Sequence, residues 1–504
     1  MNNFQHASRN QALVLTLAIF TLLSTPGMLY GQTDTVKIKW DAPVKDVKTT
    51  PTLQVVVNAQ LRRGSSMHDA AFEALKQLEC DYVRFCPWFP YPKLGVAEPD
   101  APKDGKTSWD FSLMDPIVED FMTATKGHPV VMTFSTTPQW MWKADWYTGY
   151  PADPNLEEWG YNVGTELKDP SGKQVGEYFR RLFQWYTKGG FTDEVGKKFT
   201  SNHQFDFKYW EVLNEPDGEH GINPELYNTI YDATVSEIRK VDPSVKFVGA
   251  SLMRIKDVTP DFMLTFLDPK KHKPGIPLDY VSYHSYVWIN QTRGVEVEQY
   301  TAFEQAKQFV EQFYLIDGIR KRLSPTTKSM INEIGTIRND DSQNSHSTIE
   351  PWYWSLSAAT YGYLFGEMVD MGIDVVGMSQ LIGYPNQFPC VTMIDWETNK
   401  PNLRYRALQL IKNNFSPGDK MVTWNRGADT QSDLYGRAFI TKNGKKKVLL
   451  VNMRNKKLDF ILPGAANARI DFVDESSIDG VKQRTSSSNA LSLNRFEVAV
   501  VTWP

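Results

Sequence analysis

Two glutamates lie near the ends of short apolar runs, where a buried carboxylate is unfavourable unless it has a partner or a task. The run YWEVLNE (209–215) ends at Glu215, and the run SMINEIG (329–335) contains Glu333. Two carboxyl groups about 5 Å apart can cleave a glycosidic bond, because one protonates the leaving oxygen while the other attacks the anomeric carbon. Burial and the neighbouring charge keep the donor protonated. The competing interpretation, a loop or helix-terminal carboxylate, fits one such glutamate better than it fits two.

The segments that must position these glutamates alternate between two patterns. Eight short apolar runs are typical of buried strands, at 53–59, 81–87, 129–135, 209–215, 246–251, 279–286, 329–335 and 374–380. Segments with apolar residues at helical spacing accompany them, at 72–78, 113–121, 175–186, 224–240, 259–267, 301–323, 351–369 and 403–414. This α/β alternation over residues 51–414 predicts a closed (β/α)8 TIM barrel. An open doubly wound sheet is disfavoured because no GxGxxG or P-loop pattern follows any of the strands.

The barrel prediction explains why both glutamates come at strand ends. Catalytic groups in such barrels lie at the C-terminal ends of the strands. Glu215 is expected to be the last residue of the fourth strand, with Pro216 holding its backbone extended. Glu333 has the corresponding place on the seventh strand, which faces the fourth across the mouth. We therefore expect the two carboxyl groups to meet there.

Further polar side chains are expected close to this pair. His284 and Tyr286 share one face of the sixth strand by the period-two rule, next to the strand of Glu333. Tyr286 could donate its hydroxyl to Glu333 and His284 could line a sugar subsite, unless both only pack the barrel mouth. Arg84 on the second strand could pair either with Glu333 or, as a buried structural ion pair, with Glu211. Both pairings are open at this point.

Composition and missing motifs narrow the class of partner. The net charge of −4 over 504 residues argues against nucleic acid. The sequence has no CxxC, HxH or HExxH pattern, so no metal or cofactor is expected, and the alternative of a metal-dependent barrel hydrolase is unsupported. Cys80 and Cys86 flank a strand too long for one disulfide to span, and we expect these two and Cys390 to be buried thiols.

The N-terminus has the pattern of a secretory signal peptide. Arg9 precedes a short apolar stretch, Ala12 to Leu23, and small residues follow. A stretch of twelve residues is too short to span a bilayer, which takes about 20 apolar residues. We expect residues 1–31 to be removed, so that the mature chain begins near Gln32, has no membrane span and is secreted or periplasmic.

A change of pattern near residue 415 predicts a second domain. Residues 415–504 contain short segments rich in β-branched and aromatic residues, with a two-residue hairpin turn at Asn443–Gly444. They predict a small antiparallel β-sandwich. Residues 32–50 form an N-terminal strand and linker, and the alternating run TVKIKW (35–40) is a candidate to join the sandwich.

The stretch after the third strand is a long, aromatic segment without a helical pattern. Residues 138–162 are rich in Trp and Tyr, and loops of this length in compact domains are usually functional. We interpret the segment as a wall of the binding cleft or as a lid without ligand contact. Tryptophans that could stack on a sugar ring are Trp140, Trp142 and Trp146, with Trp288 and Trp352 as weaker candidates.

Several motifs resemble those of a known family. The segments RFCP, FSTTPQWM, WEVLNEPD, LDYVSYHSY and MIDWETNKPNLRYRALQLIKNN look like those of clan A retaining (β/α)8 glycoside hydrolases. Within the clan they are most similar to glycoside hydrolase family 39, the family of β-xylosidases and α-L-iduronidases. The resemblance runs over roughly residues 50–415.

The resemblance implies a role for each residue of the central motif. Glu215 corresponds to the acid/base, Glu333 to the nucleophile and Asn214 to the partner of the substrate's 2-hydroxyl. The implied substrate is an oligosaccharide or polysaccharide, with β-xylosidase-like cleavage expected. The choice of sugar and of exo- or endo-action is open. A carbohydrate-binding protein that has lost catalysis on the same barrel is the alternative, although both carboxylates and the Asn are present.

Overall fold

A computed structural model describes residues 36–161, 164–253, 259–339, 349–383, 385, 388–426 and 433–504. The expected signal peptide at 1–31 lies outside these residues. No helix within the described ranges is long and apolar enough to cross a membrane.

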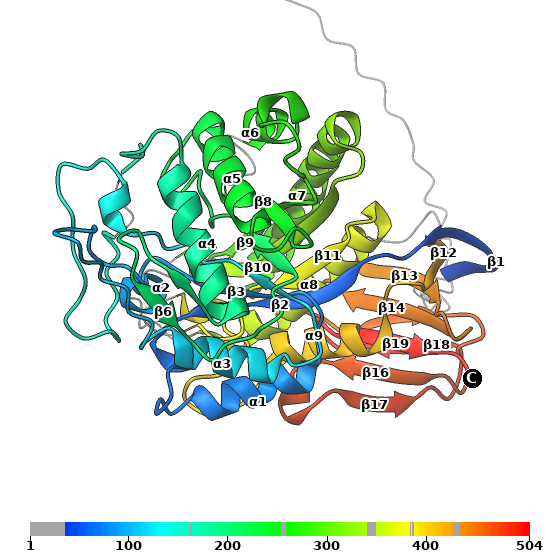
Figure 1. Cartoon of the computed structure of the whole chain (residues 1–504). Helices are drawn as coiled ribbons and strands as arrows, with labels where there is room; N and C mark the ends of the chain where they lie inside the picture. The colour runs from blue at the N-terminus through cyan, green and yellow to red at the C-terminus, as the bar shows by residue number, and fades with distance from the viewer. Residues whose placement is uncertain are drawn as a thin grey trace, which may run out of the picture. The chain divides into compact units, whose positions relative to one another are not determined.

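Eight parallel strands close into a barrel, which confirms the predicted fold (Figure 1). In chain order the strands are β2 (Thr50–Val57), β3 (Val83–Pro87), β4 (Val130–Met132), β7 (Tyr209–Glu211), β8 (Lys246–Leu252), β9 (Tyr280–Ile289), β10 (Lys328–Arg338) and β11 (Val375–Met378). Nearly all their residues are buried, because the barrel interior covers one face and the helices the other. This burial on both faces explains why the runs are apolar throughout.

The helices between the strands form the outer layer of the barrel. They are α1 (His68–Leu78), α2 (Pro92–Gly95), α3 (Asp115–Ala124), α4 (Lys173–Lys188), α5 (Pro224–Arg239), α6 (Thr259–Phe266), α7 (Val295–Leu323), α8 (Pro351–Met371) and α9 (Leu403–Asn414). Local sequence sets several of their ends. Asn223 caps α5 by accepting a hydrogen bond from the Leu226 amide, with Pro224 as the first helical residue. Gly372 ends α8 in the left-handed conformation that glycine adopts without strain.

The register of the barrel strands brings the polar candidates side by side. Glu333 on β10 is paired with His284 on β9, and Gly335 with Tyr286. On the other side of the barrel Gln54 of β2 pairs with Arg84 of β3. The strands therefore deliver these side chains to one end of the barrel without help from any loop.

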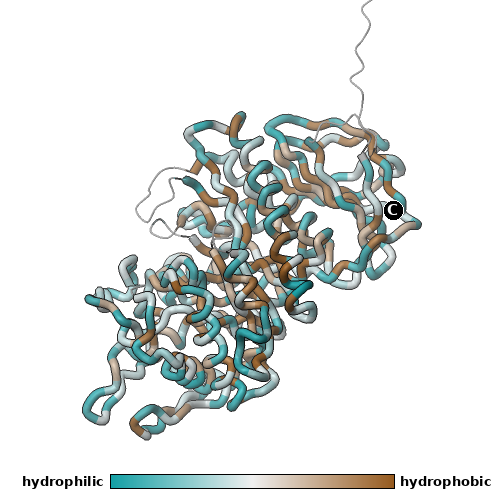
Figure 2. The backbone as a smooth tube through the Cα atoms, turned by 90° about the horizontal axis from the view of Figure 1, so that it is seen from above, coloured by the Kyte–Doolittle hydropathy of each residue, from teal (hydrophilic) through white to brown (hydrophobic). Residues whose placement is uncertain are grey.

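The C-terminal part is an antiparallel β domain, as the sequence predicts. Its seven-stranded sheet has the order β1-β12-β13-β14-β19-β16-β17, and β15 pairs with β18 in a second, two-stranded sheet. The strands are β1 (Val36–Asp46), β12 (Lys420–Arg426), β13 (Leu434–Ile440), β14 (Lys446–Asn452), β15 (Leu458–Ile461), β16 (Arg469–Val473), β17 (Lys482–Thr485), β18 (Ala490–Leu493) and β19 (Val498–Thr502). Strand β1, which precedes the barrel in the chain, pairs antiparallel with β12, so the sheet combines segments from before and after the barrel (Figure 1). In Figure 2 hydrophobic stretches run along strands of this sheet, flanked by hydrophilic loops.

Helix α8 joins the barrel to this sheet. Its Gly362 lies so close to Val451 and Val498 that an added Cβ would come within 3.1 Å of both side chains. Arg437 of β13 donates hydrogen bonds to Glu367, at 2.6 Å, and to Asp370, at 3.2 Å. The two domains therefore share a packed interface with both apolar and ionic contacts. A separate short hairpin, β5 (Gly190–Thr192) with β6 (Lys198–Thr200), extends the connection after α4.

Candidate active site

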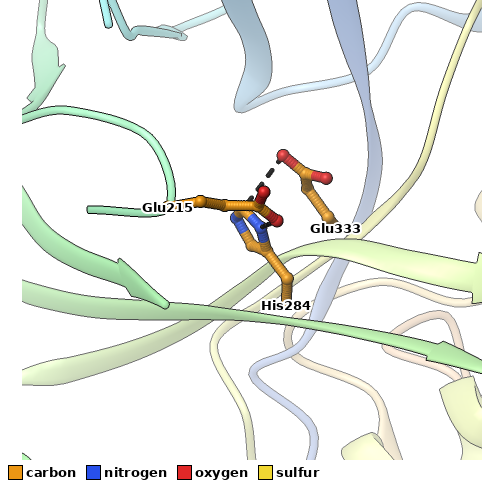
Figure 3. Close-up of side chains that lie close together, drawn as sticks. All are labelled: Glu215, His284 and Glu333. Atoms are coloured by element: carbon orange, nitrogen blue, oxygen red, sulfur yellow. Dashed lines mark hydrogen bonds and ion pairs between the residues drawn. The ribbon is translucent and has the colours of Figure 1, made fainter. Parts of the chain in front are cut away.

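Glu215 and Glu333 converge at the C-terminal end of the barrel strands, with His284 between them (Figure 3). One ligand atom from each of the three side chains lies within 4.8 Å of the other two. The Nδ1 of His284 is 2.7 Å from Oε1 of Glu215, and its Nε2 is 3.5 Å from Oε1 of Glu333. All three side chains are buried. The structure thus brings the two predicted carboxyl groups to a spacing that one sugar ring can bridge.

The backbone that presents Glu215 differs from the prediction. Strand β7 ends at Glu211, so Glu215 lies four residues beyond it, in a turn. Its φ is +42°, and that of Leu213 is +61°, so the expectation that Pro216 keeps Glu215 extended is wrong. The amide of Glu215 donates to the carbonyl of Ser251 on β8, at 3.0 Å. This hydrogen bond to the next strand, rather than the bias of the following proline, fixes the turn. Non-glycine residues at positive φ concentrate at functional sites.

Glu333 is held in the ionised form. Arg84 Nη1 donates to its Oε1 at 2.7 Å, and the hydroxyl of Tyr286 donates to its Oε2 at 2.6 Å. Burial favours the neutral acid, but the positive charges of His284 and Arg84, with the Tyr286 hydrogen bond, outweigh it and lower the pKa of Glu333. Tyr286 therefore makes the contact with Glu333 that its place on the strand predicts.

Glu215 has the opposite tendency. Burial raises its pKa and the negative charge of Glu333 adds to that rise, against the opposing hydrogen bond from His284. Burial also disfavours the charged form of His284, but the charges of Glu333 and Glu215 raise the pKa of the imidazole overall. Pairs of carboxyl groups whose surroundings push their pKa values apart are the signature of a proton donor next to a nucleophile.

Arg84 makes both of the contacts that the sequence left as alternatives. Its Nε donates to Glu211 at 2.5 Å while Nη1 donates to Glu333, and Nη2 donates to Oδ1 of Asn214 at 2.5 Å. Nη1 also donates to Oε1 of Gln54 at 2.7 Å. The planar fork of a guanidinium can serve several acceptors at fixed angles, which an ammonium cannot. Arg84 is therefore both the structural counter-ion of Glu211 and a neighbour of the candidate nucleophile.

Replacing Arg84 by leucine should lower the free energy of unfolding by about 3–5 kcal/mol, because Glu211 and Glu333 would lose their shared buried counter-ion. The matched control is Arg63→Leu. Arg63 also bonds two acids, Glu119 and Asp120, but its side chain is 51% exposed, so the change should cost less than about 1 kcal/mol. Urea denaturation of both variants measures the difference. Equal losses would contradict the view that the contacts of Arg84 matter because they are buried.

A pocket of about 350 Å³ opens above these groups. It is lined by Gln54, Val56, Cys86, Trp88, Asn214, Glu215, Met253, His284, Ser285, Tyr286, Trp288, Phe309, Glu333, Ile337, Gln380, Phe388 and Val391. Its mixture of aromatic rings with a few converging polar groups is typical of small-ligand sites. Trp288 lies at the pocket with 49% of its surface exposed, in line with its prediction as a candidate for stacking.

The tryptophans of the long loop do not reach this pocket. Trp142 is 1% exposed, stacks on His220 at a centroid distance of 4.0 Å and donates to Thr137. Trp140 is partly buried and donates to the carbonyl of Glu98, while Trp146 is 59% exposed. None of the three lines this pocket, and their stacking on a sugar stays a prediction. They were chosen from composition alone, which cannot distinguish a ring that packs the loop from one that faces a ligand.

Sequence reasoning missed two residues near the site, the tryptophan Trp88 and the buried glutamate Glu219. Trp88 follows β3 directly and lines the pocket, and Glu219 lies four residues after Glu215, buried behind Asn214. The position of Trp88 at the C-terminal end of a strand was the available signal. Trp352, a weaker candidate, is packed against the core and is not part of the pocket lining.

The described residues contain one group with the composition of a metal site, Glu215, His284 and Glu333. Both ring nitrogens of His284 already have neighbours, Glu215 at Nδ1 and Ser251 at Nε2, the latter at 3.1 Å. The Arg84 cation lies 2.7 Å from Glu333 and would repel a second cation there. The donor set therefore suits a metal poorly.

All three cysteines are buried thiols outside any disulfide, as predicted, and burial raises the pKa of the Cys80 thiol to about 12.

Comparisons with known proteins bear on the family and the fold of this chain. Residues 192–371 match the model of the glycosyl hydrolases family 39, and this segment contains Glu215, His284 and Glu333. The family resemblance is confirmed. The match supports a glycosidase that acts on carbohydrate. A search of curated protein sequences finds no match.

Solved structures with a similar fold include other glycosidases. One is a family 51 alpha-L-arabinofuranosidase from Bifidobacterium longum, with a TM-score of 0.64, 12% identity and coverage of 94% of this chain and 99% of that chain. Another is an alpha-L-arabinofuranosidase from Thermotoga maritima, with a TM-score of 0.61, 13% identity and coverage of 93% and 99%. A conserved exported protein from Bacteroides fragilis has a TM-score of 0.61 at 10% identity, with coverage of 93% and 100%. At these identities the likeness is one of fold.

Proposed function

We propose that this protein is an exported, retaining, metal-independent glycoside hydrolase that cleaves an O-glycosidic bond by double displacement. Glu215 is the acid/base and Glu333 the nucleophile. The observation that carries the proposal is the meeting of two buried carboxyl groups at the mouth of the barrel, Glu215 bound by His284 and Glu333 bound by Arg84 and Tyr286. The N-terminal signal-peptide pattern is the reason to expect export.

The reaction follows from the state of each carboxyl group. In the first step an oxygen of ionised Glu333 bonds to the anomeric carbon while the bond to the leaving oxygen breaks, and Glu215 transfers its proton to that oxygen. In the second step Glu215, now ionised, takes a proton from water as the water oxygen bonds to the anomeric carbon and releases Glu333. Two inversions restore the original anomeric configuration. The hydrogen bond from Tyr286 and the charge of Arg84 hold Glu333 in place between the steps.

The pocket supports cleavage of a terminal sugar. Its volume of about 350 Å³ is at the small end of the range for ligand sites, about 300–1,000 Å³. Trp88, Trp288 and Phe388 offer rings for stacking on a pyranose. Together with the family resemblance this favours a β-xylosidase-like exo-enzyme.

The wild-type protein tests the proposal directly. Incubation with a panel of aryl β-glycosides, followed by NMR of the first sugar released, should give a product with the anomeric configuration of the substrate. Dialysis against EDTA should leave the rate unchanged, because no step uses a metal. An inverted first product would contradict the mechanism, and loss of activity with the chelator would favour a metal-dependent hydrolase. Glycan binding without any product across the panel would favour a non-catalytic carbohydrate-binding protein.

A further inference from the structure

A third carboxyl group, that of Glu219, lies behind the candidate acid/base. Glu219 is four residues after Glu215, is 8% exposed and closes the same turn, with its amide donating to the carbonyl of Glu215 at 2.7 Å. It does not line the pocket that contains Glu215 and Glu333, so it is not in a position to contact a sugar there. Its side chain instead contacts two residues that do line it.

Those two residues are Asn214 and Trp88. Oε1 of Glu219 accepts a hydrogen bond from Nδ2 of Asn214, at 2.6 Å, and another from the indole Nε1 of Trp88. A carboxyl oxygen that accepts from both side chains fixes the direction in which the amide and the ring project. Glu219 therefore links a polar and an aromatic part of the pocket wall.

The amide of Asn214 is held from both ends. Its Oδ1 accepts from Nη2 of Arg84, a group that can only donate, and its Nδ2 donates to Glu219. These contacts exclude the flipped amide, which would set two donors against each other at Arg84. They use one of the two Nδ2 hydrogens and leave the second for a ligand in the pocket that Asn214 lines.

We propose that Glu219 is a positioning residue that aims the Asn214 amide at the substrate hydroxyl next to the anomeric carbon. The inference rests on the proposed glycosidase function. A donor to this hydroxyl contributes most in the transition state, where that hydrogen bond strengthens. Glu219 thus acts on the rate through Asn214, without touching the reacting atoms.

The positioning role does not require a charge on Glu219. Burial and the negative charge of Glu215 raise the pKa of Glu219 well above its ordinary value, against the hydrogen bonds from Asn214 and Trp88. This shift favours the neutral acid. Glutamine has the same shape and an equivalent Oε1, and should replace it.

The test compares Glu219→Ala and Glu219→Gln on two aryl glycosides, one with the 2-hydroxyl and one 2-deoxy analogue. On the hydroxylated substrate Glu219→Ala should lower kcat/KM about 10- to 100-fold, the loss typical of one strong hydrogen bond. On the 2-deoxy substrate, corrected for spontaneous hydrolysis, the loss should be under about threefold. Glu219→Gln should stay within about threefold of wild type on both.

The control is Glu298→Ala, which removes a buried glutamate of the outer helix α7 that pairs with Arg293. It should leave the ratio between the two substrates unchanged. If Glu219→Ala does not fold, Glu219→Asp, which retains the acid but shortens its reach, takes its place with the same expectation.

Each outcome bears on the inference. An equal loss on both substrates would overturn it in favour of a merely structural role, and full activity of the alanine variant on the hydroxylated substrate would also overturn it. A glutamine variant as impaired as the alanine variant would show that the charge matters and refute neutral positioning. If the wild type hydrolyses no glycoside, the proposed function fails and this inference fails with it. If the wild type hydrolyses glycosides with retention and Glu219→Ala is unimpaired, the proposed function stands and only the positioning role of Glu219 is refuted.

Discussion

Glu333→Ala should lower kcat/KM for an aryl glycoside by about 10⁴- to 10⁶-fold, the loss typical when a covalent nucleophile is removed. The carboxylate is the group that bonds to the anomeric carbon, and its hydrogen bonds from Arg84 and Tyr286 favour the ionised form at the pocket. Arg84 would lose one acceptor but keep Glu211, so the fold should persist. Steady-state rates, with a circular dichroism spectrum to verify folding, measure the effect. Activity within tenfold of wild type would contradict the assignment.

Azide gives this variant a second, sharper readout. The space left by the shortened side chain lies on the face of the sugar from which Glu333 would attack. Azide bound there should restore turnover of a substrate with a good leaving group and yield a glycosyl azide of inverted configuration, because only one displacement takes place. A glycosyl azide of retained configuration would place the nucleophile elsewhere.

The barrel could be predicted because its signals are local. Each strand is buried on both faces and reads as an apolar run, and each helix shows its own period, so eight repeats were visible without any long-range contact. The strand-end rule then indicated Glu215 and Glu333. The structure places Glu215 four residues past the end of β7, and Glu333 within β10, five residues before its end. His284 and Tyr286 followed from the period of two along β9, and their contacts with Glu215 and Glu333 agree with it.

The parts that the sequence did not predict depend on packing between distant segments. The turn at Glu215 takes its conformation from a hydrogen bond to Ser251, which belongs to another strand, and so escaped a rule based on the following proline. The sequence could not decide between Glu211 and Glu333 as the partner of Arg84, because one guanidinium contacts both acids. Glu219 carried no signal at all until Trp88 and Asn214 were seen to meet on it.

The tryptophan-rich loop, residues 138–162, is a second case in which the sequence did not predict the contacts. Its composition correctly marks a segment with many aromatic contacts, such as the stacking of Trp142 on His220. Trp159 of this loop packs against Trp88 and Phe388, two of the aromatic rings that line the pocket. Those two rings follow β3 and β11. A strand end was therefore a better guide to the ligand wall than aromatic density.

The pH profile of kcat/KM for the wild type should be bell-shaped. Its acidic and alkaline limbs should lie further apart than two glutamates of ordinary pKa would place them. Glu333 must be ionised to attack, and its pKa is lowered, so kcat/KM should fall only below the ordinary glutamate range as pH decreases. Glu215 must be protonated to donate, and its pKa is raised, so the rate should fall as pH increases through a value above that range. Because the two groups and His284 interact, the observed values belong to the set.

Glu215→Gln should remove the alkaline limb and lower kcat/KM about 10²- to 10⁴-fold for a poorly acidic leaving group, the size expected when general acid catalysis is lost. For a substrate whose leaving group departs without protonation, the variant should slow the first step far less. Hydrolysis of that substrate by the variant should therefore be limited by the second step. The amide keeps the shape of the acid and the contact at Oε1 with His284, so a change in the limb reports the proton and not a collapse of the site. The measurement is a pH profile for two aryl glycosides that differ in leaving-group acidity. An alkaline limb that survives in the variant would assign it to another group, and equal losses for both leaving groups would mean that Glu215 is not the proton donor.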